Sequence, residues 1–154
     1  MKPSVENQPT IAEIQLSYKP NLRLSQQPVI KTSEDAYKIF LKSWDMEKID
    51  FVEQFKVLLL TRSNSVLGIL NVSSGGVTST VVDPRVIFSA AIKANACAII
   101  LGHNHPSGNL KPSQPDLELT QKIKQGARYF DISVLDHVIV TKEEYFSFAD
   151  EGVL

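Results

Sequence analysis

The sequence predicts an α/β fold in which helices flank a mixed β-sheet, and two observations carry this prediction. Three segments place apolar residues at helical spacing, whereas several others are short apolar runs typical of buried strands. The two kinds of segment are interspersed along the chain. This order favours helices layered on a sheet over a helix bundle or a β-sandwich.

The composition indicates a single domain. The chain has 154 residues, of which 43% are hydrophobic and 21% charged, which is enough for one apolar core. We expect residues 31–154 to form this domain. Residues 1–30 are predicted to be an extended or flexible arm, because Pro3, Pro9 and Pro20 stand among polar residues.

The first half of the domain predicts one helix followed by a β-hairpin. Residues 33–44 have an apolar helical face, and Thr32 or Ser33 is placed to cap its start. Residues 54–61 and 66–72 are two apolar runs separated by a short polar turn, which is the pattern of a hairpin.

The second half predicts two further helices. Asp83 precedes Pro84, a pair typical of an N-cap and the first helical position, and this helix should reach about Asn95. A third helix is expected to begin at Ser113 and to end near Arg128.

Three strands are expected around these helices, over residues 77–82, 96–101 and 133–140. Residues 96–101 are apolar throughout, which is typical of a strand buried on both faces. A loop over residues 102–112 then leads to the third helix.

Charge, hydropathy and cysteine content argue against several classes of protein. The formal net charge of −1 gives none of the positive excess typical of nucleic-acid binders. No apolar stretch approaches the roughly 20 residues of a membrane helix, and the polar start lacks a signal-peptide core. Cys97 is the only cysteine and lies in an apolar run, so we expect a buried, inert thiol. These features predict a cytoplasmic protein without membrane association.

A histidine pair directly follows the buried strand. Residues two apart on an extended backbone point to the same side, so His103 and His105 can present imidazole nitrogens to one metal ion. Asp116 stands on the first turn of the predicted third helix, and the turn-forming residues before it can bring that turn back over the strand end. Two imidazoles, a carboxylate and an open position for water match a catalytic zinc site. The spacing therefore predicts Zn²⁺ bound by His103, His105 and Asp116, with metal-bound water as the nucleophile.

Hydrolysis also needs an acid–base group and a donor to the developing oxyanion. Glu53 is the candidate base, because it immediately precedes a strand that should lie beside the strand over residues 96–101. Ser113 can donate a hydrogen bond to the oxyanion. Glu47 is a nearby competitor for the role of base.

Each of these residues also has a structural interpretation. Ser113 and Asp116 have the spacing of a helix N-cap with an acidic residue three positions on. A glutamate at a loop-to-strand junction, such as Glu53, is usually a charged side chain exposed to solvent. His137, in the last predicted strand, is expected to be structural. A solvated face is also expected for the basic residues of the third helix, Lys122, Lys124 and Arg128.

The pattern resembles that of the JAB/MPN (JAMM) metalloproteases, which have a glutamate, then His-x-His, seven residues and Ser-x-x-Asp. More closely, residues 103–109 (His-Asn-His-Pro-Ser-Gly-Asn), followed by Pro112-Ser113 and residues 135–137 (Leu-Asp-His), look like the RadC family, traditionally labelled DNA repair. The likeness covers about residues 33–154. It implies the JAB/MPN fold, similar to the cytidine deaminase architecture.

The same resemblance implies zinc on His103, His105 and Asp116, with Glu53 as general base and Ser113 as oxyanion partner. Asn104 stands where proteolytic members carry serine or threonine and where RadC members carry asparagine. Full-length RadC proteins resemble this chain only after a helix-hairpin-helix-like region, which residues 1–30 cannot supply. DNA binding by that region is therefore not part of the expectation.

The leading hypothesis is a zinc-dependent hydrolase of a peptide or isopeptide amide, acting on a peptide or protein substrate. Nucleobase deamination also uses zinc-activated water. However, its sites carry His-x-Glu and a downstream Pro-Cys-x-x-Cys, whereas Cys97 precedes the histidines here. The alternative from another class is a DNA-repair-associated or mobile-element-associated module with a structural metal and no protease activity.

Overall fold

The computed structural model describes residues 11–15, 18–21, 23–76 and 81–154. Its centre is a five-stranded sheet in the order β2-β1-β3-β4-β5. The strands are β1 (Gln54–Leu60), β2 (Val66–Ser74), β3 (Ala98–Asn104), β4 (Ser133–Val140) and β5 (Tyr145–Ser147). Only β3 and β4 run parallel, and the other neighbouring pairs are antiparallel. The sheet is therefore mixed, as the sequence predicts.

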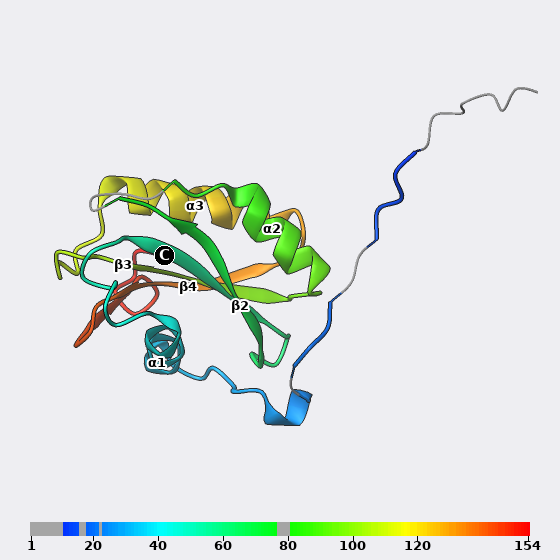
Figure 1. The fold of residues 1–154 in the computed structure, drawn as a ribbon, viewed down its shortest axis with the longest axis horizontal. Helices are drawn as coiled ribbons and strands as arrows, with labels where there is room; N and C mark the ends of the chain where they lie inside the picture. The colour runs from blue at the N-terminus through cyan, green and yellow to red at the C-terminus, as the bar shows by residue number, and fades with distance from the viewer. Residues whose placement is uncertain (1–10, 16–17, 22, 77–80) are drawn as a thin grey trace, which may run out of the picture.

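Among the described residues, three α-helices flank the sheet, which confirms the predicted α/β class. They are α1 (Ser33–Ser43), α2 (Pro84–Lys93) and α3 (Gln114–Arg128), and a short 3-10 helix, η1, spans Leu24–Gln26. Helix α1 covers one face of the sheet, whereas α2 and α3 cover the other (Figure 1). The expected caps are present, since the Thr32 side chain accepts from the Asp35 backbone N–H and Asp83 precedes Pro84 at the start of α2.

The two faces of the sheet hold separate apolar cores. On β1, Leu58 and Leu60 pack under α1, whereas Val57 and Leu59 pack with α2 and α3. Strand β3 alternates in the same way, with buried residues on both faces. Both strands are thus covered on two sides, which explains the apolar runs of residues 57–60 in β1 and 98–101 in β3.

The structure departs from the predicted strands in three places. Strand β3 continues to Asn104 instead of ending at Leu101, because β1 pairs with it up to His103, opposite Phe55, and β4 pairs with it up to Asn104, opposite Val140. Strand β5 is three residues long and was not predicted. Most of the strand expected over residues 77–82 lies outside the described residues, and its last two residues belong to no helix or strand.

The Cys97 thiol, expected to be buried, is only half-buried.

The described part of the N-terminal arm, residues 11–15 and 18–21, contains no helix or strand. It contacts the sheet edge at Tyr18, whose hydroxyl donates to the carbonyl of Leu67 on β2 at 2.7 Å. The division into an arm and a domain remains a prediction. Among the described helices, none has the length and apolarity needed to cross a membrane.

Gly102 lets helix α1 approach β3 immediately before the histidine pair. A Cβ atom at this position would lie 2.6 Å from Cζ of Phe40, a fully buried side chain of α1. Contacts between real Cβ atoms and their neighbours are essentially never so short. The ring has no solvent-exposed direction in which to move, so only glycine fits without displacing α1.

Gly102→Ala is therefore expected to destabilise the protein by about 1–3 kcal/mol, the usual cost of overpacking a filled core. Urea unfolding measures this change. Gly68→Ala on β2 is the matched control, because an added Cβ there meets nothing within 4 Å. Equal stability of the two variants would show that the contact between Phe40 and β3 is not tight.

Candidate metal centre

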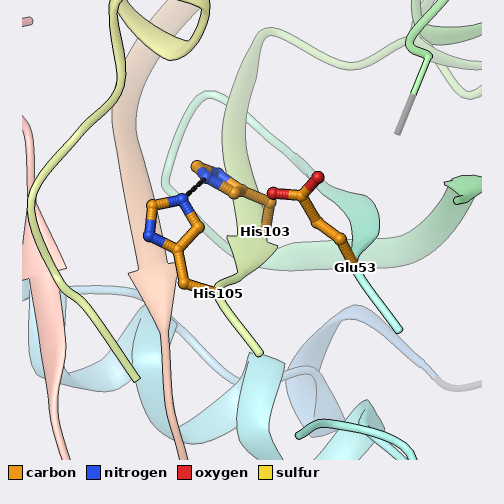
Figure 2. A group of neighbouring side chains, drawn as sticks. All are labelled: Glu53, His103 and His105. Carbon is orange, nitrogen blue, oxygen red and sulfur yellow. Dashed lines mark hydrogen bonds between the residues drawn. The ribbon is translucent and has the colours of Figure 1, made fainter. Parts of the chain in front are cut away.

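The end of β3 places both histidines of the pair on the same side. His103 lies inside the strand and is 2% exposed, and His105 follows it and is half-buried. Their Nε2 atoms are 2.8 Å apart (Figure 2). The alternation of an extended backbone thus brings the two imidazoles together, as the His-x-His spacing predicts.

Asp116 approaches this pair from the first turn of α3. Its Oδ1 lies 3.4 Å from Nε2 of His103, and its Oδ2 lies 3.4 Å from Nε2 of His105. The same carboxylate also completes a capping box, because Oδ2 accepts the backbone N–H of Ser113 at 2.8 Å. Asp116 can therefore serve both as a capping residue and as a ligand, because the cap fixes the carboxylate that faces the histidines.

Ser113 is the N-cap of α3, and its Oγ accepts the backbone N–H of Asp116 at 3.2 Å. Capping uses the oxygen as an acceptor and leaves the hydroxyl proton available as a donor. Ser113 also lines an open cavity of about 310 Å³ together with Glu53, His105 and Lys111. Capping the helix and donating to a bound substrate are therefore compatible roles.

Glu53 enters the site from the residue before β1. Its side chain is only 8% exposed, and its carboxylate lies in a group with the two histidines whose ligand atoms are all within 4.8 Å of one another. Figure 2 shows this carboxylate directed toward His103. The Glu53 backbone is held by the end of β2, since its carbonyl accepts the N–H of Gly75 at 2.9 Å. Glu47, the competing candidate, is exposed and does not belong to this group.

The strand adjacency that suggested Glu53 is confirmed. Strands β1 and β3 pair antiparallel, with Phe55 opposite His103, so the start of β1 meets the end of β3. Antiparallel pairing is what brings a residue before one strand to the histidines at the end of the other.

Asn104, between the two histidines, points to the opposite face and ties the Glu53 loop to β3. Its side chain is fully buried. Its Nδ2 donates to the carbonyls of Ile49 and Val52 at 2.7 and 2.8 Å, and its Oδ1 accepts the N–H of Gln54 at 2.7 Å. In the sequence, Asn104 could be recognised only as a residue typical of the family it resembles. Its bonds require both donors and an acceptor of an amide, which serine and threonine cannot supply.

His137 is the neighbour of His103 that sequence reasoning missed. It was expected to be structural, and it is fully buried on β4. Its Nε2 lies 2.7 Å from Nδ1 of His103, and its Nδ1 lies 2.6 Å from Oγ1 of Thr120 on α3. Burial lowers the pKa of His137 well below its ordinary value, which keeps the ring neutral. The parallel pairing of β3 with β4 places His137 beside the pair, and no local sequence pattern reveals that pairing.

The electrostatics of the site favour a cation between the rings. Burial alone would raise the pKa of Asp116, but its hydrogen bonds with His103 and His105 outweigh burial and hold the pKa far below the ordinary value. Burial lowers the pKa of His105, yet the bonds with Asp116 and the carbonyl of Asn109 raise it above the ordinary value overall. A proton and a metal ion would therefore compete for the same position.

The donor set fits a zinc ion. Imidazole nitrogen binds Zn²⁺ at about 2.0–2.1 Å and carboxylate oxygen at about 2.0–2.2 Å. Two Nε2 atoms separated by 2.8 Å can both contact one ion, since their separation is less than twice that bond length. The carboxylate of Asp116 faces both nitrogens, and Glu53 adds a second carboxylate close to the same pair.

Asn104→Asp is expected to destabilise the protein by about 3 kcal/mol or more. It leaves two buried carbonyls without donors and turns a carboxylate toward them. Urea unfolding would detect this loss. Asn71→Asp, at an exposed position of β2, is the matched control and should change stability by less than about 0.5 kcal/mol. A similarly small effect at Asn104 would contradict its anchoring role.

Comparison with known proteins identifies the family. The model of the RadC-like JAB domain matches residues 30–153. The chain is 46% identical over 101 residues to a UPF0758 protein of Flavobacterium johnsoniae, covering 66% of this chain and 44% of that protein. It is 40% identical over 128 residues to a UPF0758 protein of Desulfitobacterium hafniense, covering 83% and 55%. The chain thus spans about half the length of these relatives. These matches confirm the resemblance seen in the motif, and the chain belongs to the RadC-like JAB domain family.

Proposed function

We propose that this domain is a zinc-dependent hydrolase of peptide or isopeptide amides, with the metal held by His103, His105 and Asp116. The observation that carries the proposal is the convergence of three ligand groups from two elements, with both Nε2 atoms 3.4 Å from the Asp116 carboxylate. Zinc held there would supply an acidified water and polarise a substrate carbonyl.

Glu53 and Ser113 are assigned the proton transfer and the oxyanion contact. Both line the same open cavity beside His105, so an amide that enters the cavity meets both groups. Glu53 would accept a proton from the attacking water and return it to the departing amine. The Ser113 hydroxyl would donate to the oxygen of the carbonyl under attack.

Two carboxylates face the histidine pair, and their positions support different roles. Asp116 lies 3.4 Å from each Nε2 atom and is fixed by the helix cap, which suits a ligand. Glu53 lies in the group whose ligand atoms are within 4.8 Å of one another, and it also lines the cavity, which suits an acid–base group that must reach the substrate. We therefore assign the metal to Asp116 and the proton transfer to Glu53.

Zinc content tests this division. Asp116→Asn is expected to lose stoichiometric zinc, because an amide is a poor substitute for an anionic ligand, whereas Glu53→Gln should retain it. Elemental analysis of protein purified in excess zinc measures both. Loss of zinc in Glu53→Gln together with retention in Asp116→Asn would reverse the two assignments.

Activity tests the reaction itself. The wild type is expected to cleave members of peptide or isopeptide libraries, and Glu53→Gln at matched zinc loading should be slower by about 10²–10⁴-fold, the usual contribution of general acid–base catalysis. Glu47→Gln, an exposed glutamate on the same loop, is the control and should retain full activity. Equal turnover in Glu53→Gln and the wild type would exclude Glu53 as the base.

The second candidate function is a DNA-associated module without hydrolysis, and one surface favours it. Lys122 and Arg128 lie exposed on α3 with Tyr129, which is 87% exposed, and they line a common hollow. Arg128 is the last residue of α3, whereas Asp116 lies in its first turn, so this surface is separate from the candidate metal centre. DNA binding there should weaken steeply with salt, and an absence of binding at low salt would exclude this function.

A further inference from the structure

A buried chain of hydrogen bonds runs from the backbone of Asp116 to His103. The Thr120 hydroxyl donates to the carbonyl of Asp116 at 2.6 Å and lies 2.6 Å from Nδ1 of His137. Nε2 of His137 lies 2.7 Å from Nδ1 of His103. Thr120 and His137 are fully buried and His103 is 2% exposed, so solvent does not replace these bonds.

The bond between Thr120 and Asp116 determines which atom donates in every other hydrogen bond of this series. A carbonyl oxygen can only accept, so the single Thr120 proton points to Asp116. The Thr120 oxygen must then accept from Nδ1–H of His137. In the neutral ring the other nitrogen of His137 is an acceptor, and Nδ1–H of His103 donates to it. Nε2 of His103 is left with its lone pair directed at the site.

His105 reaches the same tautomer by a separate route. Its Nδ1 lies 2.6 Å from the carbonyl of Asn109, which can only accept, so the proton is on Nδ1. Both rings therefore direct Nε2 to one point, where the Asp116 carboxylate also converges and where a proton would take the place of the metal. The carbonyl of Asn109 fixes the tautomer of His105, whereas the tautomer of His103 depends on two side chains, Thr120 and His137.

We propose that Thr120 and His137 are positioning residues that hold His103 as its Nδ1–H tautomer and so commit its Nε2 to the metal. This inference rests on the zinc site proposed above and deepens it. Because Thr120 donates to the carbonyl of Asp116, this series of hydrogen bonds also links the orientation of His103 to α3, the helix that carries Asp116. Outer partners of this kind typically change metal affinity about 10–100-fold.

The tautomers can be read directly in the zinc-free protein. Long-range ¹⁵N–¹H NMR of the imidazole rings, recorded above the titration range seen in the same spectra, distinguishes Nδ1–H from Nε2–H. We expect Nδ1–H for both His103 and His137 in the wild type. Nε2–H on either ring would overturn the proposal.

We call the hydrogen bonds from Thr120 through His137 to His103 the relay. Thr120→Val tests it, because valine has nearly the shape of threonine but no hydroxyl. Without the hydroxyl, Nδ1–H of His137 has no acceptor, so we expect His137 to shift toward Nε2–H and His103 to accept at Nδ1. Zinc affinity, measured by competition with a chelator, should fall about 10-fold or more. Thr120→Ser keeps the hydroxyl and should restore wild-type affinity and tautomers.

Three results would separate this inference from the proposed function. Wild-type affinity in Thr120→Val, or an equal loss in Thr120→Val and Thr120→Ser, would overturn the relay alone. Zinc binding with the expected tautomers but without amide hydrolysis would support the relay and contradict the hydrolase. No zinc binding by the wild type would overturn both.

Discussion

The pairing of β3 with β1 up to His103, and with β4 up to Asn104, is the constraint on which the candidate site depends. Strand β1 holds one side, with Phe55 opposite His103, and β4 holds the other, with Val140 opposite Asn104. An extended backbone held in this way sends neighbouring residues to opposite faces. His103 and His105 thus face α3, while Asn104 anchors the Glu53 loop on the α1 side. One short segment therefore positions groups on both faces of the sheet.

The parts of the site that the sequence predicted are those encoded by local spacing. The His-x-His alternation and the Ser113–Asp116 cap each depend on residues a few positions apart, so the pattern and the geometry agree. Glu53 needed one inference about strand order, which the antiparallel pairing of β1 with β3 confirms. The helices were predicted for the same reason, since apolar periodicity and capping residues are local.

What the sequence did not predict depends on contacts between distant segments. The contact between His137 and His103 follows from the parallel pairing of β3 with β4, and the role of Asn104 follows from a loop about 50 residues earlier. The end of β3 was placed too early, because Gly102, His103 and Asn104 have no apolar signal although pairing with the neighbouring strands keeps them in the sheet. Three-residue β5 is too short for a period to be recognised.

We propose above that one ion joins these elements through His103, His105 and Asp116. Crystals of the zinc-loaded protein, measured on both sides of the zinc absorption edge, test this claim most directly. We expect one anomalous peak at about 2.0–2.2 Å from Nε2 of each histidine and from a carboxylate oxygen of Asp116. A peak elsewhere, or one bound by Glu53 with Asp116 turned away, would contradict it.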